Sequence, residues 1–395
     1  MKVSLERQVE LNVTCVCFHP SNWEYISIVS DNKDIYIYRL ENDLRSGNKP
    51  LKLNKHRGNI SSIDWSLLPK SYYKANNKLL YSQLLSVGED RLVINWVLKE
   101  RNENIEIVTR IINTLQSDCY PLSCRFSNVL DNYCKFSIST TSGDIFIFNS
   151  KKITSCNESE NNHYLLPNNE NYSDIIELGS LLKFEQLKVS ISDLPLTCIC
   201  WSDDDRFLIC GGIENKGLIL YISSNSSNSL SLDKKDFEYT EFDLKLISSI
   251  NTQNSILACS ISPKNNLIVF TDKDSNIYFT EVNKSLNCIS HTLKWEGLPF
   301  FNLKFVDDKT IVAVGYDCIP IIFTQISGCV WEHAKNLNSS ILPPYLDSTW
   351  LSNFDPMKHY EPNTVHRRPI INAFPKDQKT IICFGCDGKY SLWNF

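Results

Sequence analysis

The feature of this sequence that most constrains its fold is a degenerate pattern that recurs seven times. Each copy begins with an alternating apolar segment ending in a bulky residue and closes, after a polar turn, with a second alternating segment ending at an aromatic position. The bulky residues are Phe18, Trp65, Phe126, Trp201, Ile261, Phe305 and Phe374, and the closing positions are Tyr38, Trp96, Phe148, Tyr221, Thr280, Phe323 and Trp393. These positions lie 18 to 22 residues apart in six copies and 31 apart in the second, which contains the insertion 69–78. A constant internal distance with variable gaps indicates repeated sheet units joined by expandable loops.

A small polar residue stands six positions before each closing position. These residues are Asn32, Asp90, Ser142, Asn215, Asp274, Asp317 and Asp387. Such side chains hold a tight turn by hydrogen-bonding its backbone. We therefore expect Asp90, Asp274, Asp317 and Asp387 to brace turns within the repeats, together with His56, which precedes Gly58 in the second copy. No acid or base recurs beside these aspartates, so a catalytic role is not expected for them.

The repeat predicts an all-β fold, a seven-bladed β-propeller of the WD-repeat type that occupies residues 1–395 as a single domain. Seven blades of about 40–45 residues need about 300 residues. The surplus is expected in two polar loop insertions, 150–192 and 223–249, and in an insert between blades 6 and 7, 333–365. The last copy lacks a fourth strand, and the segment 3–9 has the length to supply it. The ring is therefore predicted to close through an N-terminal strand in the last blade, which removes exposed sheet edges.

Composition excludes several classes of function. The net charge of −5 provides no overall basic field, so nucleic-acid binding is not expected. No apolar run is long enough to span a bilayer, so membrane insertion is not expected either. The 15 cysteines are scattered and odd in number, which favours small buried side chains in a reducing cytosol. The pair Cys383-x-x-Cys386 has no second pair beside it, and neither a phosphate-binding glycine loop nor a nucleophile elbow is present. The sequence thus predicts no metal, no cofactor and no catalytic residues.

Three short stretches resemble one family of WD-repeat proteins. They are Asp317-Cys318-x-Pro320 followed by Gly328-Cys329, the run from His56 to Trp65 with the Asp90-Arg91 turn, and the terminal Asp387-Gly388 with Trp393-Asn394-Phe395. Together they are similar to the WD-repeat subunit of the actin-related protein 2/3 complex. The resemblance implies a non-catalytic scaffold in a complex that nucleates branched actin filaments. The partners that it implies are the other subunits, actin and nucleation-promoting activator proteins, in the cytoplasm at the actin cytoskeleton.

The insert between blades 6 and 7 has an apolar stripe. Its members, which recur at helical spacing, are Leu346, Trp350, Leu351 and Phe354. Pro344 suits the first turn of a helix and Pro356 would end it, so a short helix is expected there. The resemblance implies that such an insert projects and binds actin or an activator, which makes the stripe the expected partner-binding site. The alternative is a loop folded back on the propeller wall. Residues 346–355 contain no Lys or Arg, unlike the more basic inserts of the family.

Two other functions fit a propeller. A WD-repeat adaptor of a ubiquitin ligase, a coat or a chromatin complex would share the fold, but it would have no reason to carry both the blade 6 stretch and the insert after it. A propeller enzyme would gather several His, Asp or Glu side chains around its channel. No two of the seven histidines lie at ligand spacing within one strand or turn, which disfavours that function.

Overall fold

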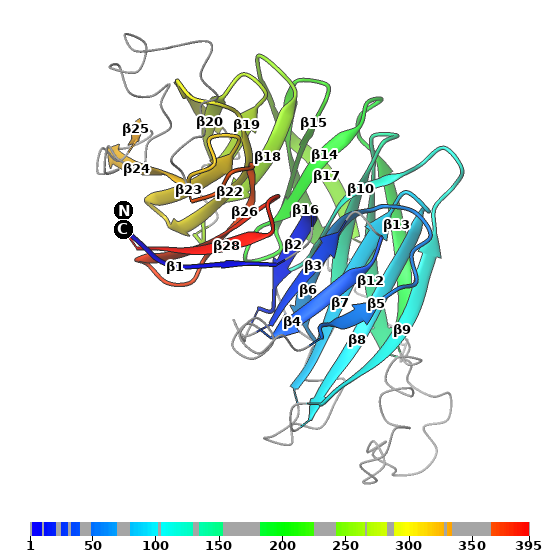
Figure 1. Ribbon diagram of the computed structural model, residues 1–395. Helices are drawn as coiled ribbons and strands as arrows, with labels where there is room; N and C mark the ends of the chain where they lie inside the picture. Colours follow the sequence, from blue (N-terminus) through cyan, green and yellow to red (C-terminus); the bar gives the residue numbers. More distant parts are fainter. Residues whose placement is uncertain are drawn as a thin grey trace, which may run out of the picture.

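The computed structural model describes 14 segments of the chain, with gaps between them. The segments are 2–9, 12–20, 25–30, 33–39, 49–68, 80–101, 104–128, 134–152, 182–224, 242–264, 267–282, 288–327, 330–333 and 365–394. They contain strands and no helix, arranged as seven four-stranded antiparallel sheets. The innermost strands of successive sheets contact one another all the way round, β26 with β2 included. The prediction of a seven-bladed β-propeller is confirmed (Figure 1).

Each blade runs from an innermost strand at the central channel to an outer strand at the rim. The innermost strands are β2 (Val13–Phe18), β6 (Ile60–Leu67), β10 (Pro121–Phe126), β14 (Leu196–Trp201), β18 (Ile256–Ile261), β22 (Phe300–Asp307) and β26 (Ile370–Pro375). The second strands are β3 (Tyr25–Ser30), β7 (Leu80–Gly88), β11 (Lys135–Thr140), β15 (Phe207–Gly212), β19 (Leu267–Asp272), β23 (Thr310–Gly315) and β27 (Thr380–Gly385). The third strands are β4 (Ile35–Arg39), β8 (Leu92–Arg101), β12 (Asp144–Lys152), β16 (Lys216–Ser224), β20 (Asn276–Val282), β24 (Ile321–Ser327) and β28 (Lys389–Asn394). The outer strands are β5 (Leu51–Leu53), β9 (Asn104–Thr114), β13 (Leu182–Ser190), β17 (Phe242–Asn251), β21 (Cys288–Lys294), β25 (Val330–His333) and β1 (Lys2–Gln8).

The N-terminal strand closes the ring, as the sequence predicts. β1 pairs antiparallel with β28 from Lys2 opposite Asn394 to Gln8 opposite Lys389, and Val9 N–H then donates to Gly388 O at 2.8 Å. Figure 1 shows β1, in blue, beside β28, in red. Blade 7 therefore takes three strands from the end of the chain and one from its beginning, which hydrogen-bonds the edge of β28.

A β-bulge recurs at one place in all seven blades. The register between the first and second strand shifts just after the first residue of the innermost strand, for example between Ile60 and Ser62 in blade 2. A bulge bends the strand and increases its twist. Two bulged residues also link neighbouring blades, because Ser61 Oγ donates to Pro121 O at 2.6 Å and Thr197 Oγ1 donates to Ile256 O at 2.7 Å.

A left-handed residue also recurs in all seven blades, in the turn between the second and third strands. The seven are Lys33, Arg91, Gly143, Asn215, Ser275, Cys318 and Gly388, with φ between 59° and 77°. Only two of them are glycine. A non-glycine residue with φ near +60° costs roughly 1–2 kcal/mol, so the blade geometry imposes this conformation on sequences that do not favour it. The backbone therefore keeps the sevenfold repeat more faithfully than the side chains do.

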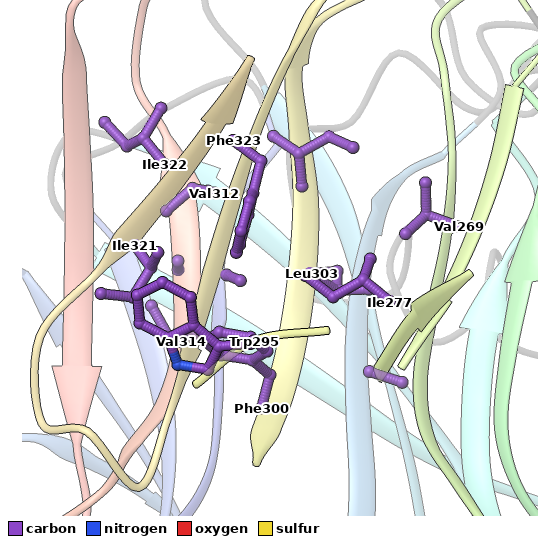
Figure 2. Packing of buried hydrophobic residues seen from close by; sticks show 14 of the residues in the cluster. Val269, Ile277, Trp295, Phe300, Leu303, Val312, Val314, Ile321, Ile322 and Phe323 are labelled. Atoms are coloured by element: carbon purple, nitrogen blue, oxygen red, sulfur yellow. The ribbon is translucent and has the colours of Figure 1, made fainter. Parts of the chain in front are cut away.

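The core lies between neighbouring blades. Its largest cluster spans blades 5, 6 and 7 and is centred on Trp295, Phe300 and Phe323, which pack together in Figure 2. The ring of Phe323 meets those of Trp295 and Phe300 nearly at right angles, with centroids 5.8 and 5.9 Å apart. Stacked rings of Phe279 and Trp331, 4.8 Å apart, join blade 5 to blade 6. Aromatic pairs at such distances add about 0.5–1.5 kcal/mol each beyond the area that they bury.

The two segments predicted as polar loop insertions include outer strands. Within 150–192 lies β13, and within 223–249 lies most of β17, which continues to Asn251. The repeat pattern covers only the inner part of each blade and contains no signal for a fourth strand, so it predicts loops where these two strands lie. The remaining parts, 153–181 and 225–241, lie outside the described residues. None of the described residues forms a helix that is long and apolar enough to cross a membrane.

Stability should depend on pH through His19, which follows β2 and is 2% exposed. Its ring meets the indole of Trp65 edge-on at 5.0 Å, and burial lowers the pKa of His19 to about 4. In the unfolded chain this pKa is about 6.5. Stability from the neutral ring is therefore complete above pH 6.5 and is lost as the pH falls towards 4. Because of His19, we expect the free energy of unfolding to be about 2 kcal/mol lower at pH 5 than at pH 7. Urea unfolding at both pH values should show this loss, and His19→Gln should reduce it. An equal loss in the variant would contradict the assignment.

Candidate interaction sites

Blade 2 has a four-membered polar network behind its turn. Asp90 accepts hydrogen bonds from Arg57 N–H at 2.7 Å and from His56 Nδ1 at 3.0 Å. His56 Nε2 lies 2.8 Å from Ser86 Oγ, and Trp96 Nε1 donates to the same oxygen at 2.8 Å. With His56 neutral and protonated on Nδ1, the Ser86 hydroxyl donates to Nε2 and accepts from the indole, so every group is satisfied. The network joins the loop before β6, strands β7 and β8, and the turn between them.

The electrostatics fit this assignment. Burial lowers the pKa of His56 and outweighs the opposite effect of Asp90. Burial acts to raise the pKa of Asp90, but hydrogen bonds from Arg57 and His56 outweigh it, and the pKa lies below its ordinary value. The neutral imidazole of His56 is hydrogen-bonded to the carboxylate of Asp90 in the turn, and this contact stabilises the blade. All of its donors and acceptors are used within the blade, so the network leaves no group free for proton transfer.

Blade 7 repeats the network with its serine on the opposite strand. His366 Nδ1 lies 3.2 Å from Asp387 Oδ1, while His366 Nε2 and Trp393 Nε1 meet Ser391 Oγ at 2.7 and 2.6 Å. Ser391 pairs across the sheet with Cys383. In blade 2 the serine, Ser86, is on the second strand and faces Ile94 on the third. The serine hydroxyl thus lies on different strands in the two blades, but in both it contacts one histidine and one tryptophan.

This exchange of strands is testable. Ser391→Ala leaves the buried His366 and Trp393 nitrogens without their hydroxyl and should cost about 2 kcal/mol of the free energy of unfolding. The double variant Cys383→Ser with Ser391→Ile rebuilds the arrangement of blade 2 and should recover most of that loss in chemical denaturation. If the double variant is as unstable as Ser391→Ala, the two hydroxyl positions are not equivalent.

Blade 6 replaces the histidine with tryptophan. Trp295 Nε1 donates to Asp317 Oδ2 at 2.7 Å, and Leu298 N–H donates to Asp317 Oδ1 at 2.9 Å. Asp317 is thus a buried carboxylate that holds the loop before β22 against the turn after β23. The same indole belongs to the apolar core of the blade. One side chain therefore supplies both the polar brace and the packing.

In blade 5 the buried carboxylate is Asp272 and not the expected Asp274. Asp272 is fully buried and accepts hydrogen bonds from the backbone N–H groups of Asp274 and Asn276, each at 2.9 Å, and from the Tyr278 hydroxyl at 2.8 Å. Asp274 is exposed, and its side chain accepts one bond, from Asn254 Nδ2 at 3.2 Å. The spacing identified the right turn, but within it the residue two positions earlier makes the brace.

Blade 4 contains a brace that the sequence interpretation missed. Ser192 Oγ donates to Glu214 Oε2 at 2.7 Å, and these residues occupy the places of His56 and Asp90. The spacing was counted from Tyr221, which gave Asn215. The residue that matches Trp96 in register is Leu220, which is 1% exposed, and six positions before it stands Glu214. Tyr221 points to the other face of the sheet, so choosing the aromatic residue shifted the count by one.

Exposed apolar side chains gather on the face that carries these braces. This face, the brace face, consists of the loops into the innermost strands and the turns between second and third strands. Its large apolar residues are Tyr120, Leu194, Ile213, Leu298 and Tyr316, each 42–46% exposed. They belong to blades 3, 4 and 6. Exposed apolar side chains on one face of a protein are available for contact with a partner.

The predicted partner-binding residues, Leu346, Trp350, Leu351 and Phe354, lie outside the described residues. The described ends of the insert are His333, the last residue of β25, and Val365, which precedes β26. They flank a connection that runs from an outer strand to the next innermost strand. Connections of this kind lie on the brace face, so Val365 lies there, before the innermost strand of blade 7. Within the 14 described segments, no group of three or more His, Cys, Asp or Glu side chains is arranged to hold a metal ion.

The comparisons with known proteins point in one direction. No protein-family model matches the chain. A Xenopus laevis protein named actin-related protein 2/3 complex subunit 1A-B is 23% identical over 412 residues, which covers 97% of this chain and 94% of that protein. Subunit 1 from Saccharomyces cerevisiae is 44% identical over 45 residues, or 11% of this chain and 12% of that protein. Subunit 1A from Arabidopsis thaliana is 20% identical over 331 residues, or 82% of this chain and 73% of that protein. The resemblance found in the sequence is therefore confirmed: along almost its whole length, the chain is similar to subunit 1 of the actin-related protein 2/3 complex.

Proposed function

We propose that this chain is the propeller subunit of an actin-related protein 2/3 complex, where it serves as a non-catalytic scaffold for the nucleation of branched actin filaments. It binds the other subunits of the complex, and it acts in the cytoplasm at the actin cytoskeleton. The observation that carries the proposal is the similarity to proteins named as subunit 1 of that complex, which extends over 97% of the chain. A match of this extent includes the blades, the connections and the insert together.

The structure supports a binding role over a catalytic one. His56 is hydrogen-bonded to Asp90 and His366 to Asp387, so these histidines and carboxylates stabilise turns within their blades. The brace face presents apolar side chains from three blades. A rigid ring with exposed apolar loops fits a scaffold, since its binding groups keep fixed relative positions.

We further propose that Leu346, Trp350, Leu351 and Phe354 contact actin or an activator protein. The stripe has helical spacing, and a segment of about three turns is too short to be stable alone in water. It would therefore order against a partner. The absence of basic residues from 346–355 favours an apolar contact over an electrostatic one.

Purification of the tagged chain from its native cell, followed by mass spectrometry, tests the scaffold proposal. Two actin-related proteins and several small companion subunits should be recovered in amounts equal to the chain at moderate salt. Recovery of a ubiquitin ligase, coat or chromatin assembly instead would leave the propeller intact and refute the actin function.

Substitution of the insert tests the contact. Leu346→Ala, Trp350→Ala and Phe354→Ala together should leave the complex assembled but reduce activator-dependent actin polymerisation at least about tenfold, because apolar anchors supply most of the binding energy at an interface. Ser348→Ala with Ser352→Ala is the matched control in the same segment and should be neutral. Full activity of the triple variant would exclude the contact without affecting the scaffold proposal.

A further inference from the structure

The central channel is polar and unevenly charged. Residues from all seven innermost strands line a hollow of about 190 Å³. Hydroxyl, amide and thiol groups dominate its wall, among them those of Ser62, Ser123, Thr197, Asn302 and Asn372. Two cations, Arg125 and Lys304, line this hollow, and no carboxylate does. The chain as a whole carries a net charge of −5. The wall of this hollow, with two positive charges and no negative charge, has the opposite sign.

Both cations have donors to spare. Arg125 is half-buried, and its one hydrogen bond within the described residues runs from Nη1 to Cys124 O at 2.7 Å. A guanidinium has five N–H donors. Lys304 is half-buried and has no hydrogen-bond or ion-pair partner in the described part of the chain. A half-buried charge is costly to leave without a partner, so Lys304 is suited to a ligand, and Arg125 offers the unused N–H donors of its guanidinium.

The two cations face one region of the channel, although they belong to blades 3 and 6. Both also line the hollow at one end of the channel, beside Cys200. Burial raises the pKa of the Cys200 thiol, while Lys304 and Arg125 both act to lower it. The sulfur atom thus lies within the field of each charge.

The nearest carboxylates balance only part of the positive charge of the inner hollow. Asp64 and Asp203 line only the end of the channel. Asp64 Oδ2 accepts from Phe126 N–H at 2.7 Å and Oδ1 accepts from the Cys17 thiol at 3.6 Å. Burial acts to lower the pKa of Arg125, but the charge of Asp64 outweighs it, and the pKa lies above its ordinary value. Asp203 belongs to a group with Asp204 and Asp205, whose like charges, after burial, raise its pKa. Asp64 thus balances Arg125 from the end of the channel, and Lys304 remains the unbalanced positive charge of the inner wall.

We propose that the channel binds a small oxyanion, a phosphate group held between Arg125 and Lys304. The guanidinium offers a planar pair of donors that matches two phosphate oxygens, and the ammonium adds a point charge from the opposite side. Hydroxyl and amide groups of the wall complete the site. This inference does not depend on the proposed function, since it concerns the ring alone.

Calorimetric titration of the full chain with inorganic phosphate tests the site, in a zwitterionic buffer at constant ionic strength set with sodium chloride. We expect a dissociation constant on the order of 1 mM or tighter. Lys304→Met should weaken binding at least about tenfold, because a hydrogen bond to a charged group is lost. Lys273→Met removes the same charge from an exposed turn on the brace face and should leave binding unchanged.

Two results would overturn the proposal. One is the absence of heat at phosphate concentrations far above 1 mM, on the order of twentyfold. The other is phosphate binding of wild-type affinity in folded Lys304→Met. Glucose 6-phosphate distinguishes the sources of the anion. Displacement of inorganic phosphate by the sugar phosphate indicates a phosphate ester as the ligand, and binding of inorganic phosphate alone indicates the free ion.

Discussion

Removal of residues 2–9 is expected to cost at least about 5 kcal/mol of the free energy of unfolding, which is most of the stability of an ordinary domain. The deletion removes the ladder between β1 and β28, which contains six paired positions. It also leaves β28 as an unpaired edge, with backbone groups that have no partner from the chain. The rest of blade 7 would then hold its place in the ring through contacts of its inner strands alone. We expect aggregation or proteolysis of blade 7 before any other blade.

A transplanted strand provides the control. Since Lys2 pairs with Asn394 and the strands are antiparallel, residues 2–9 can be moved behind Asn394 through a two-residue Asn-Gly turn that replaces Phe395. This variant has the same strand in the same register and a chain that begins after Val9. Thermal unfolding should show near-native stability for the transplant and a large loss for the deletion. Equal stability of the deletion and the intact protein would show that the ring does not need its fourth strand in blade 7.

Asp272→Ala is expected to destabilise the protein by about 4 kcal/mol or more, whereas Asp274→Ala should cost less than about 0.5 kcal/mol. Both residues lie in one turn of blade 5. Asp272 is fully buried, and its removal leaves the N–H groups of Asp274 and Asn276 and the Tyr278 hydroxyl without their acceptor. Each buried donor without a partner costs about 1–3 kcal/mol. Asp274 is exposed, so water replaces the one bond that its side chain accepts.

Urea unfolding of the two variants measures the difference directly. Asp272→Asn is the conservative control, because its amide keeps one acceptor oxygen and should recover part of the loss. If Asp274→Ala proves the more destabilising, the spacing rule used on the sequence identifies the brace better than the structure does. Similar small losses for both would mean that blade 5 does not depend on its turn.

The repeat alone predicts the ring. The number of residues from the bulky position to the closing position is fixed by the lengths of the second and third strands of a blade. That distance from Phe18 to Tyr38, or from Phe374 to Trp393, survives in copies whose side chains have diverged. Apart from β1, the outer strands escaped prediction because only one side of each is paired. Their sequences are therefore less constrained, and β13 and β17 follow long polar stretches.

The braces were harder to predict than the ring. A spacing counted from the closing position finds Asp90, Asp317 and Asp387, where the carboxylate stands at the end of the turn. It selects Asp274 in blade 5, where the buried carboxylate has moved to the last residue of β19. It selects Asn215 in blade 4, because the aromatic residue Tyr221 lies next to Leu220, which occupies the equivalent position. Spacing locates a turn, whereas the choice of acceptor within it depends on which side chain is buried.

The pairing of β1 with β28 has a consequence for synthesis of the protein. β1 leaves the ribosome long before β28, because synthesis proceeds at about 5–20 residues per second. For 395 residues, this rate keeps β1 without its partner strand for roughly 20–80 s. The six other blades are each continuous in sequence, so they are able to form as they emerge. β1 therefore stays unpaired in the nascent chain until β28 has been made. A chaperone that binds extended segments would find a target in β1, and the pairing of β1 with β28 would follow the folding of the six other blades.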